Sequence, residues 1–203
     1  MKPPLALLEH LTITIKRSEG DLDEVGMYKI LGAMSKLQSI VLGLDASISS
    51  HSEFWTETHK PYYKRDNRVM HSYLTDALVN KAVDEVLATA IFRTISAAKP
   101  DRSLPLERLE VIPSGDCSPG RSGDFGTRWS DIMQHIERSW LVKRMYPGLG
   151  SDEPSVNRVR SKELDPPLVF STAAKDMLRR VWHVRPGTKW DFQKDWHSFS
   201  REQ

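Results

Sequence analysis

The chain has 203 residues, of which 39% are hydrophobic and 28% are charged, and its formal net charge is +2. This length suits one domain with one core, and the balanced charge argues against a surface dedicated to nucleic acid. The single cysteine, Cys117, excludes an internal disulfide, and no apolar run is long enough to span a membrane. We therefore expect a single domain, 1–203, in a reducing compartment, the cytosol or the nucleus.

Three stretches share one spacing of apolar residues. They start at Leu8, Leu37 and Leu106, and apolar side chains follow at offsets of 3, 5 and, in the first two, 7. Such alternation is typical of a short strand with one buried and one exposed row. Pro113 is expected to end the third stretch, and SWLVK at 139–143 is a weaker fourth strand.

Apolar residues between and after these strands follow helical spacing. The first helix is predicted over 22–35, and its apolar face comprises Met27, Ile30, Leu31 and Met34. A long helix is predicted over 72–98, with an apolar face of Val79, Ala82, Val83, Val86, Leu87, Ala90, Ile91 and Ile95. A third contains Trp129, Ile132, Met133 and Ile136, and a last one contains Ala174, Met177, Leu178, Val181 and Trp182.

The starts at Leu8 and Leu37 are 29 residues apart, and the interval from Leu106 to Ile136, where a looser fourth repeat starts, is 30, a period within the range of solenoid repeats. The interval of 69 residues between Leu37 and Leu106 is longer because it contains an insertion. We therefore predict an α/β fold: a leucine-rich-repeat-like solenoid with a short curved parallel sheet of about four strands and helices on one face. Residues 46–71 are predicted to be an insertion, and 146–170 an extended connection. Residues 171–203 are predicted to form a helix and a tryptophan-rich cap over the last repeat.

The L-x-x-L-x-L strands resemble those of a degenerate leucine-rich-repeat protein, with Lys16, Asp45 and Ser114 where typical repeats carry asparagine. More specifically, the phrases AIFRTISAAKPDRSLPLERLEVIPSG, IMQHIERSWLVKR and KWDFQKDWHSF look like a group of fungal proteins described as F-box or leucine-rich-repeat-like. This resemblance implies a non-catalytic role in recognising substrates for ubiquitin ligation. The F-box itself is not in this chain, which we expect to be the recognition part of a longer protein.

The alternative function is that of an enzyme, a nucleotide hydrolase. Gly115–Ser122, GDCSPGRS, has phosphate-loop spacing between a strand and a helix, and Asp45 ends a strand of the kind that holds magnesium. However, Arg121 replaces the phosphate-binding lysine, and Pro119 removes one amide from the loop. A surface loop is therefore the favoured interpretation, and no cofactor is expected.

Other reactive or aromatic residues also have simpler explanations. His51, His59 and His71 match no zinc-site spacing, and Cys117 has no histidine fixed beside it, so neither a metal site nor a nucleophile is expected. An aromatic group could pack the insertion onto the helices, contact a protein or stack on single-stranded nucleic acid, and packing is favoured. Its members are Phe54, Trp55, Tyr62 and Tyr63.

Candidate binding residues form the row opposite the core row of the strands. Helices on one face of a sheet leave the other face toward solvent, and an apolar centre with a charged rim is typical of an interaction surface. We therefore predict a protein-binding site with an unidentified protein partner. Its residues are Thr12, Thr14, Lys16, Val41, Asp45, Glu110, Ile112 and Ser114, around Gly43 and continued by Leu141 and Lys143.

Overall fold

The computed structural model describes residues 7–47, 75–115, 132–133, 135–145, 154–160, 172–183, 187, 189, 191 and 196–198. Within these ranges the chain has an α/β fold with an open five-stranded sheet. The strands lie in chain order: β1 (His10–Lys16), β2 (Ser39–Asp45), β3 (Arg108–Ser114), β4 (Ser139–Lys143) and β5 (Ser155–Arg160). No described helix is long and apolar enough to cross a lipid bilayer.

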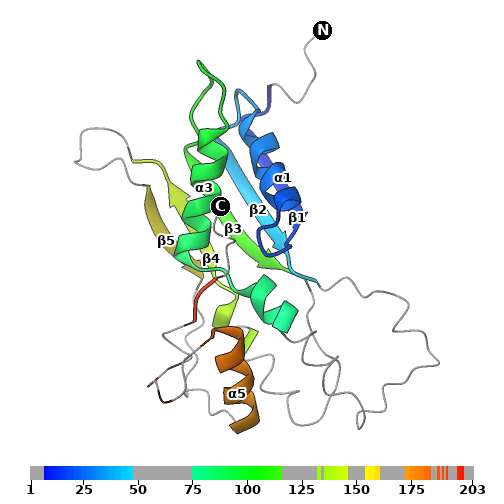
Figure 1. The fold of residues 1–203 in the computed structure, drawn as a ribbon. Helices are drawn as coiled ribbons and strands as arrows, with labels where there is room; N and C mark the ends of the chain where they lie inside the picture. The colour runs from blue at the N-terminus through cyan, green and yellow to red at the C-terminus, as the bar shows by residue number, and fades with distance from the viewer. Residues whose placement is uncertain are drawn as a thin grey trace, which may run out of the picture.

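Two helices cover one face of this sheet. Figure 1 shows α1 (Leu22–Gly32) over the β1 side and α3 (Glu85–Ala97) beside it, with α5 (Thr172–Val181) below the sheet. Each of α1 and α3 starts at an aspartate N-cap, because the carboxylates of Asp21 and Asp84 accept hydrogen bonds from backbone N–H groups three residues later. The connections β1–α1–β2 and β2–α3–β3 place both helices side by side in one layer (Figure 1).

The prediction of a parallel sheet of about four strands is wrong for the second half of the sheet. Strands β1, β2 and β3 are parallel, but β4 is antiparallel to β3, and β5 is antiparallel to β4. Strand β5 lies within 146–170, which was predicted to be an extended connection. The chain between Lys143 and Ser155 is too short for a helical crossover, so the two strands it joins pair antiparallel.

Pro113 does not end β3, which continues to Ser114. Pairing between β3 and β4 stops at Val111, whereas Pro113 still lies opposite Leu44 of β2. Among the described strands, β3 is therefore paired only with β2 at Pro113, and its other side is not paired with β4 there. A residue without an N–H group is tolerated at such a position.

The predicted apolar face of the first helix is also wrong in part. Leu31 is buried, but Met27 and Ile30 are 36% and 56% exposed, and α1 instead turns Glu24, Tyr28 and Gly32 toward the interior. A charged residue can take a core position here because hydrogen bonds satisfy its carboxylate. Spacing of apolar residues cannot detect that arrangement.

Within the predicted helix over 72–98, the described residues form two helical segments, 75–81 and α3. The break precedes Asp84, whose side chain caps α3. The break changes the phase of the apolar face, so Val86 is 69% exposed and Ala90 is also exposed. The other six residues of the predicted face are buried.

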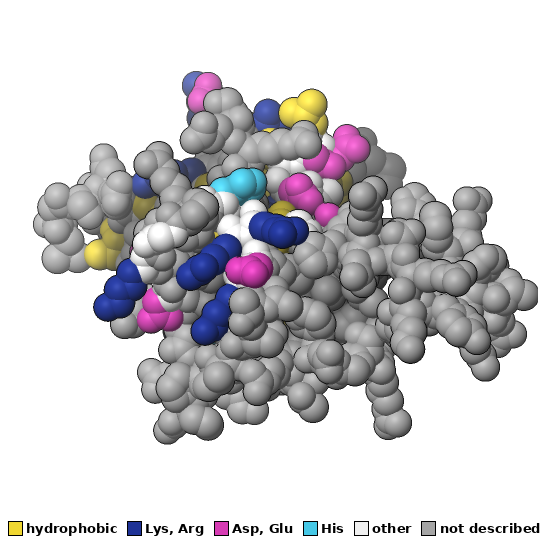
Figure 2. Space-filling view, turned by 60° about the horizontal axis from the view of Figure 1, so that its bottom comes forward, with side chains coloured by type: hydrophobic (Ala, Val, Ile, Leu, Met, Phe, Trp, Pro, Cys, Tyr) yellow, Lys and Arg dark blue, Asp and Glu magenta, His cyan; other side chains and the backbone are white. Residues whose placement is uncertain are grey.

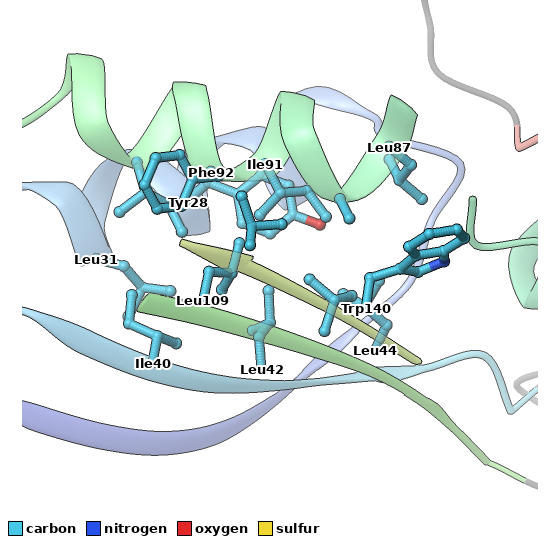
Figure 3. Packing of buried hydrophobic residues seen from close by; sticks show 14 of the residues in the cluster. Tyr28, Leu31, Ile40, Leu42, Leu44, Leu87, Ile91, Phe92, Leu109 and Trp140 are labelled. Carbon is cyan, nitrogen blue, oxygen red and sulfur yellow. The ribbon is translucent and has the colours of Figure 1, made fainter. Parts of the chain in front are cut away.

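The core lies between the sheet and the pair α1 and α3, and β2 is at its centre (Figure 3). The predicted core row of β2, Ile40, Leu42 and Leu44, has no exposed surface. Leu109 and Val111 of β3 are equally buried, and Trp140 of β4 closes the core while its ring N–H donates to the Val83 carbonyl at 2.9 Å. The alternation in the sequence therefore identifies the buried side of the sheet.

Gly32 allows α1 and α3 to approach each other, and Gly32→Ala is expected to destabilise the protein. A β-carbon at Gly32 would lie 2.4 Å from the Ile95 carbonyl oxygen and 2.6 Å from the Ala98 β-carbon. Separating the helices should cost about 1 to 3 kcal/mol. Gly26→Ala is the matched control, since a β-carbon there meets no atom within 4 Å. It should stabilise α1 by about 0.5 to 1 kcal/mol.

Urea denaturation of both variants would measure these opposite changes. Equal changes in the two free energies of unfolding would show that helix propensity, rather than the α1–α3 contact, determines the effect.

Candidate functional site

The sheet face opposite α1 and α3 brings all eight predicted binding residues together. Strand pairing places them in three rows, each crossing β1, β2 and β3. The rows are Thr12–Val41–Glu110, Thr14–Gly43–Ile112 and Lys16–Asp45–Ser114. Their side chains point away from the core because successive residues of a strand face opposite sides.

The centre of this open face consists of small and apolar side chains with one hydroxyl group. Thr14 is exposed, Ile112 is half-buried, and Gly43 lies between them. A β-carbon on Gly43 would come within 2.7 Å of the Thr14 hydroxyl oxygen, so Thr14 occupies the space beside the glycine. Together with Val41, the centre offers methyl groups and one hydroxyl rather than a cluster of reactive groups.

One corner of the face, at the carboxyl ends of β1 and β2, is polar. The Lys16 ammonium lies 4.0 Å from an Asp45 carboxylate oxygen and donates to the Ser47 hydroxyl at 3.3 Å. Burial alone raises the pKa of Asp45. The hydrogen bonds from Ser47 and the positive charges of Lys16 and Lys81 together have a larger, opposite effect, so the pKa of Asp45 lies below its ordinary value. The carboxylate is therefore ionised at neutral pH and is oriented by Ser47.

A second charged group lies on the opposite side of the face. The Arg108 guanidinium donates to a Glu110 carboxylate oxygen at 3.0 Å, and Arg108 pairs with Lys143 of β4. Leu141 pairs with Glu110, so the predicted continuation onto β4 lies in the same surface. The face thus combines an apolar centre with charges of both signs.

Three polar residues of this surface were missed in the sequence. Ser47 contacts the Lys16 corner, Arg108 extends the β3 row, and Asn157 pairs with Leu141. The same alternation that selected Glu110 could have found Arg108, which lies two residues earlier. Ser47 follows the strand, and Asn157 belongs to β5, whose sequence has a weak strand pattern.

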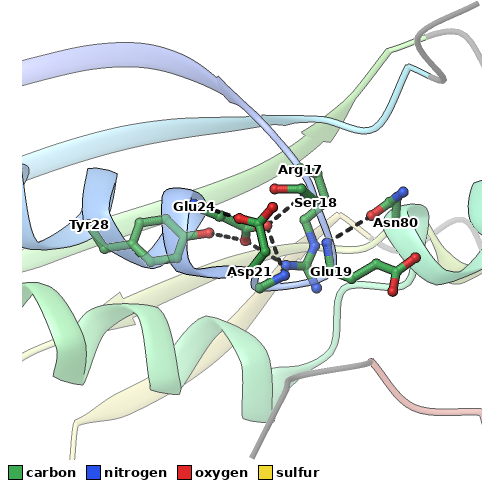
Figure 4. A network of polar contacts seen from close by, with 8 residues as sticks. Arg17, Ser18, Glu19, Asp21, Glu24, Tyr28 and Asn80 are labelled. Atoms are coloured by element: carbon green, nitrogen blue, oxygen red, sulfur yellow. Dashed lines mark hydrogen bonds and ion pairs between the residues drawn. The ribbon is translucent and has the colours of Figure 1, made fainter. Parts of the chain in front are cut away.

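A buried polar network fixes the turn between β1 and α1 (Figure 4). The Arg17 guanidinium donates to Glu24 Oε1 at 2.5 Å, and the Tyr28 hydroxyl donates to the same oxygen at 2.5 Å. Glu24 Oε2 accepts from the backbone N–H groups of Ser18 and Gly20 at 2.7 and 2.9 Å. Because Arg17, Glu24 and Tyr28 are all buried, this network organises the fold rather than contacting a ligand.

The buried phenol of Tyr28 is held in its protonated form. Burial raises its pKa, and the negative charge of Glu24 and the hydrogen bond to it raise the pKa further. The hydroxyl therefore remains a donor across the physiological pH range. No sequence motif marks this network, since its members meet through the fold.

Most of the phosphate-loop-like segment, including Cys117, lies outside the described residues, and so do the three histidines and the aromatic group. The first residue of that segment, Gly115, is described and has a φ of 94°. A β-carbon there would lie 2.4 Å from both Asp45 Oδ1 and Ser47 N, so the start of the loop lies against the end of β2. Among the described residues, no group of three His, Cys, Asp or Glu side chains could hold a metal ion.

The described part of the tryptophan-rich tail packs against the body of the domain. Trp196 is buried, and the Arg138 guanidinium lies 4.5 Å from the centre of its ring. The Trp182 ring N–H donates to the His197 carbonyl at 2.7 Å, and Ser198 donates through its N–H and hydroxyl to Asp84. Residues Trp190, Phe192 and Phe199 of the predicted cap lie outside the described side chains.

Charges of both signs also occur at the lower end of the molecule. Figure 2 brings this end forward and shows Lys and Arg side chains interspersed with Asp and Glu around a histidine. Exposed residues of α5 and the turn after it include Lys175, Asp176, Arg180 and His183. The described part of this end therefore presents mixed charge rather than the continuous basic surface typical of nucleic-acid binding.

Comparison of the chain with protein-family models, with curated proteins and with solved structures finds no match.

Proposed function

We propose that this protein is a non-catalytic protein-interaction module whose open sheet face contacts a partner protein. The proposal rests on one observation: three neighbouring strands contribute residues to one open face, and Val41 and Ile112 lie near the centre of that face. Charged residues of both signs, Lys16, Asp45 and Glu110, surround that centre. An apolar centre within a polar rim is the usual anatomy of a protein interface.

The resemblance to fungal F-box and leucine-rich-repeat-like proteins supports a more specific form of this proposal. In that form, the sheet face recognises a protein substrate for a ubiquitin ligase, in the cytosol or the nucleus. In this proposal the three parallel strands with α1 and α3 represent a short solenoid, supported by the arrangement of both helices in one layer (Figure 1), and antiparallel β4 and β5 follow it. The tryptophan-rich tail is its cap, supported by the contacts of Trp182 and Trp196.

Arginine at the centre of the open face is expected to weaken partner binding strongly. Val41→Arg and Ile112→Arg each place a charge where a bound partner would exclude water. Loss of a hot-spot residue at the centre of an interface costs about 2 kcal/mol or more of binding free energy, which is about thirtyfold in affinity. Both positions are half-buried on the solvent side of the sheet, so the folded state should persist. Val86→Arg is the control, because Val86 is exposed on the helical layer.

Affinity purification with parent and variant proteins, followed by mass spectrometry, would compare their partners. We expect the parent and Val86→Arg to recover the same protein, and the two sheet variants to lose it. Recovery of every parental partner by both sheet variants would reject the open face and would make the segment Phe54–Tyr63 the better candidate.

A further inference from the structure

Strand β1 forms a free edge of the sheet among the described strands. Arg17 N donates to the Asp45 carbonyl, and the Glu9 carbonyl accepts from Gln38 and Ser39, so odd-numbered residues direct their main-chain groups toward β2. Because this direction alternates along a strand, the even-numbered residues direct theirs toward the free edge. The N–H and C=O groups on that edge belong to His10, Thr12, Thr14 and Lys16.

The other edge of the sheet, β5, is less suited to pairing with another strand. Its pairing with β4 has a register shift at Ser139 and Trp140, and its sequence includes Arg158 and Arg160. Irregularities and charged residues are devices that protect sheet edges. Strand β1 has neither a charge nor a proline between Leu11 and Ile15, and its register with β2 is continuous.

The core is incompletely covered along the β1 edge. Leu11 and Ile13 are half-buried, whereas their β2 partners, Ile40 and Leu42, are fully buried. Helix α1 adds exposed apolar surface on this side. Ile30 lies two residues before Gly32, hence about 200° round the helix axis. Since Gly32 contacts α3, Ile30 lies on the side of α1 that faces away from α3. Helix α1 is on the β1 side of the helical layer (Figure 1), so this is the side of the free edge.

We propose that the β1 edge binds a second copy of this chain, with the two β1 strands antiparallel about a two-fold axis at Ile13. The central segment of β1, Leu11–Ile15, is self-complementary in this register, and His10 lies opposite Lys16 of the partner subunit at the ends of the paired segment. Thr12 lies opposite Thr14 of the partner subunit, and Leu11 lies opposite Ile15 of the partner subunit. Every pair keeps its polar side chains on the open face and its apolar side chains on the core face.

This arrangement satisfies the free edge of β1 and covers the apolar surface beside it. The even-numbered residues form the hydrogen-bonded pairs, while Ile13 faces Ile13 of the partner subunit in a non-hydrogen-bonded pair. The axis is perpendicular to the sheet, so the two copies of α1 lie on the same face with Met27 and Ile30 between them. The open faces of both subunits remain free for a protein partner.

Sedimentation equilibrium would test the proposed dimer directly. The parent chain, 23.2 kDa as a monomer, should sediment at twice this mass at micromolar concentration. Thr12→Pro removes an N–H group that points to the free edge, while the β1–β2 hydrogen bonds of the odd-numbered residues remain, so this variant should be monomeric. Thr12→Ala keeps the N–H group and should stay dimeric.

Ile30→Glu is a second dissociating variant that leaves β1 unchanged. Ile30 is exposed, so the variant should fold, and it should be monomeric because two glutamates would face each other across the axis. A monomeric parent would overturn the proposal and leave the edge to a strand of another protein or of a longer form of this chain. Dimers that persist in both folded Thr12→Pro and Ile30→Glu would also overturn it.

Disulfide crosslinking would test the register. In a Cys117→Ser background, Ile13→Cys should form a disulfide-linked dimer on oxidation, because its β-carbon lies about 4.5 to 5.5 Å from its symmetry mate in a directly opposed pair. Thr12→Cys faces its own copy only diagonally, at about 7 to 8 Å, and should not crosslink. Crosslinking of Thr12→Cys without Ile13→Cys would reject the two-fold axis at Ile13.

Discussion

We expect Leu42→Ala to lower the free energy of unfolding by about 2 to 5 kcal/mol, because it removes a fully buried side chain and leaves a cavity. Leu42 has no exposed surface and lies in the central part of β2, between Ile13 of β1 and Val111 of β3. Chemical denaturation followed by circular dichroism would measure the loss.

Leu22→Ala is the matched control for this substitution. It removes the same atoms from a side chain that is 87% exposed at the start of α1, so the free energy of unfolding should change by at most about 0.5 kcal/mol. A Leu42→Ala protein with the denaturation midpoint of the parent would contradict the assignment of the core face of β2.

Glu24→Gln should have an effect of similar size, about 3 to 5 kcal/mol, because it leaves the buried Arg17 guanidinium without its counter-charge. The amide cannot replace the carboxylate. Its NH₂ group would face either the N–H groups of Ser18 and Gly20 or the donors of Arg17 and Tyr28. Whichever way the amide is turned, donors would meet donors inside the protein.

Two further variants separate charge from hydrogen bonding at this network. Asp23→Asn neutralises an exposed carboxylate in the first turn of the same helix and should cost about 0.3 to 1 kcal/mol. Tyr28→Phe removes one donor to Glu24 and should cost about 1.5 to 3 kcal/mol. A Glu24→Gln protein no less stable than Asp23→Asn would contradict the buried ion pair.

The pH dependence of stability provides an additional check on Tyr28. Its pKa is raised in the folded state above the ordinary value of 10.0, so its contribution is fully present below pH 10.0 and is lost as pH rises above that value. We therefore expect the parent to lose stability above pH 10.0 more steeply than Tyr28→Phe. Denaturation midpoints measured between pH 8 and pH 11 would compare the two slopes.

Strands β1 to β4 and the open face were predictable from the sequence because their apolar and polar residues alternate by two, most weakly in β4. Helical cover on one side buries Ile40, Leu42 and Leu44, so the residues between them must lie on the other side. Alternation contains no information about strand direction, so it could not show that β4 is antiparallel. Strand β5 was missed because its valines stand among polar and basic residues.

The face of α1 could not be predicted from apolar spacing because it depends on a buried ion pair that forms across the β1–α1 turn. Apolar spacing favoured Met27 and Ile30, whereas the interior receives Glu24, whose charge is compensated by Arg17 across the β1–α1 turn. The exposure of Met27 and Ile30 is, in turn, one observation from which the dimer is inferred. A conflict between local pattern and packing thus identified a surface that the sequence did not suggest.

The most direct test of the proposed function is hydroxyl-radical footprinting of the protein alone and in complex with a partner recovered by the parent chain. Oxidation at Val41, Ile112 and Leu141 should fall in the complex, since these side chains lie together on the open face. Oxidation at Val86, on the helical layer, should stay unchanged. Protection of Val86 with unchanged oxidation at Val41 and Ile112 would contradict the assignment of the sheet face as the binding surface.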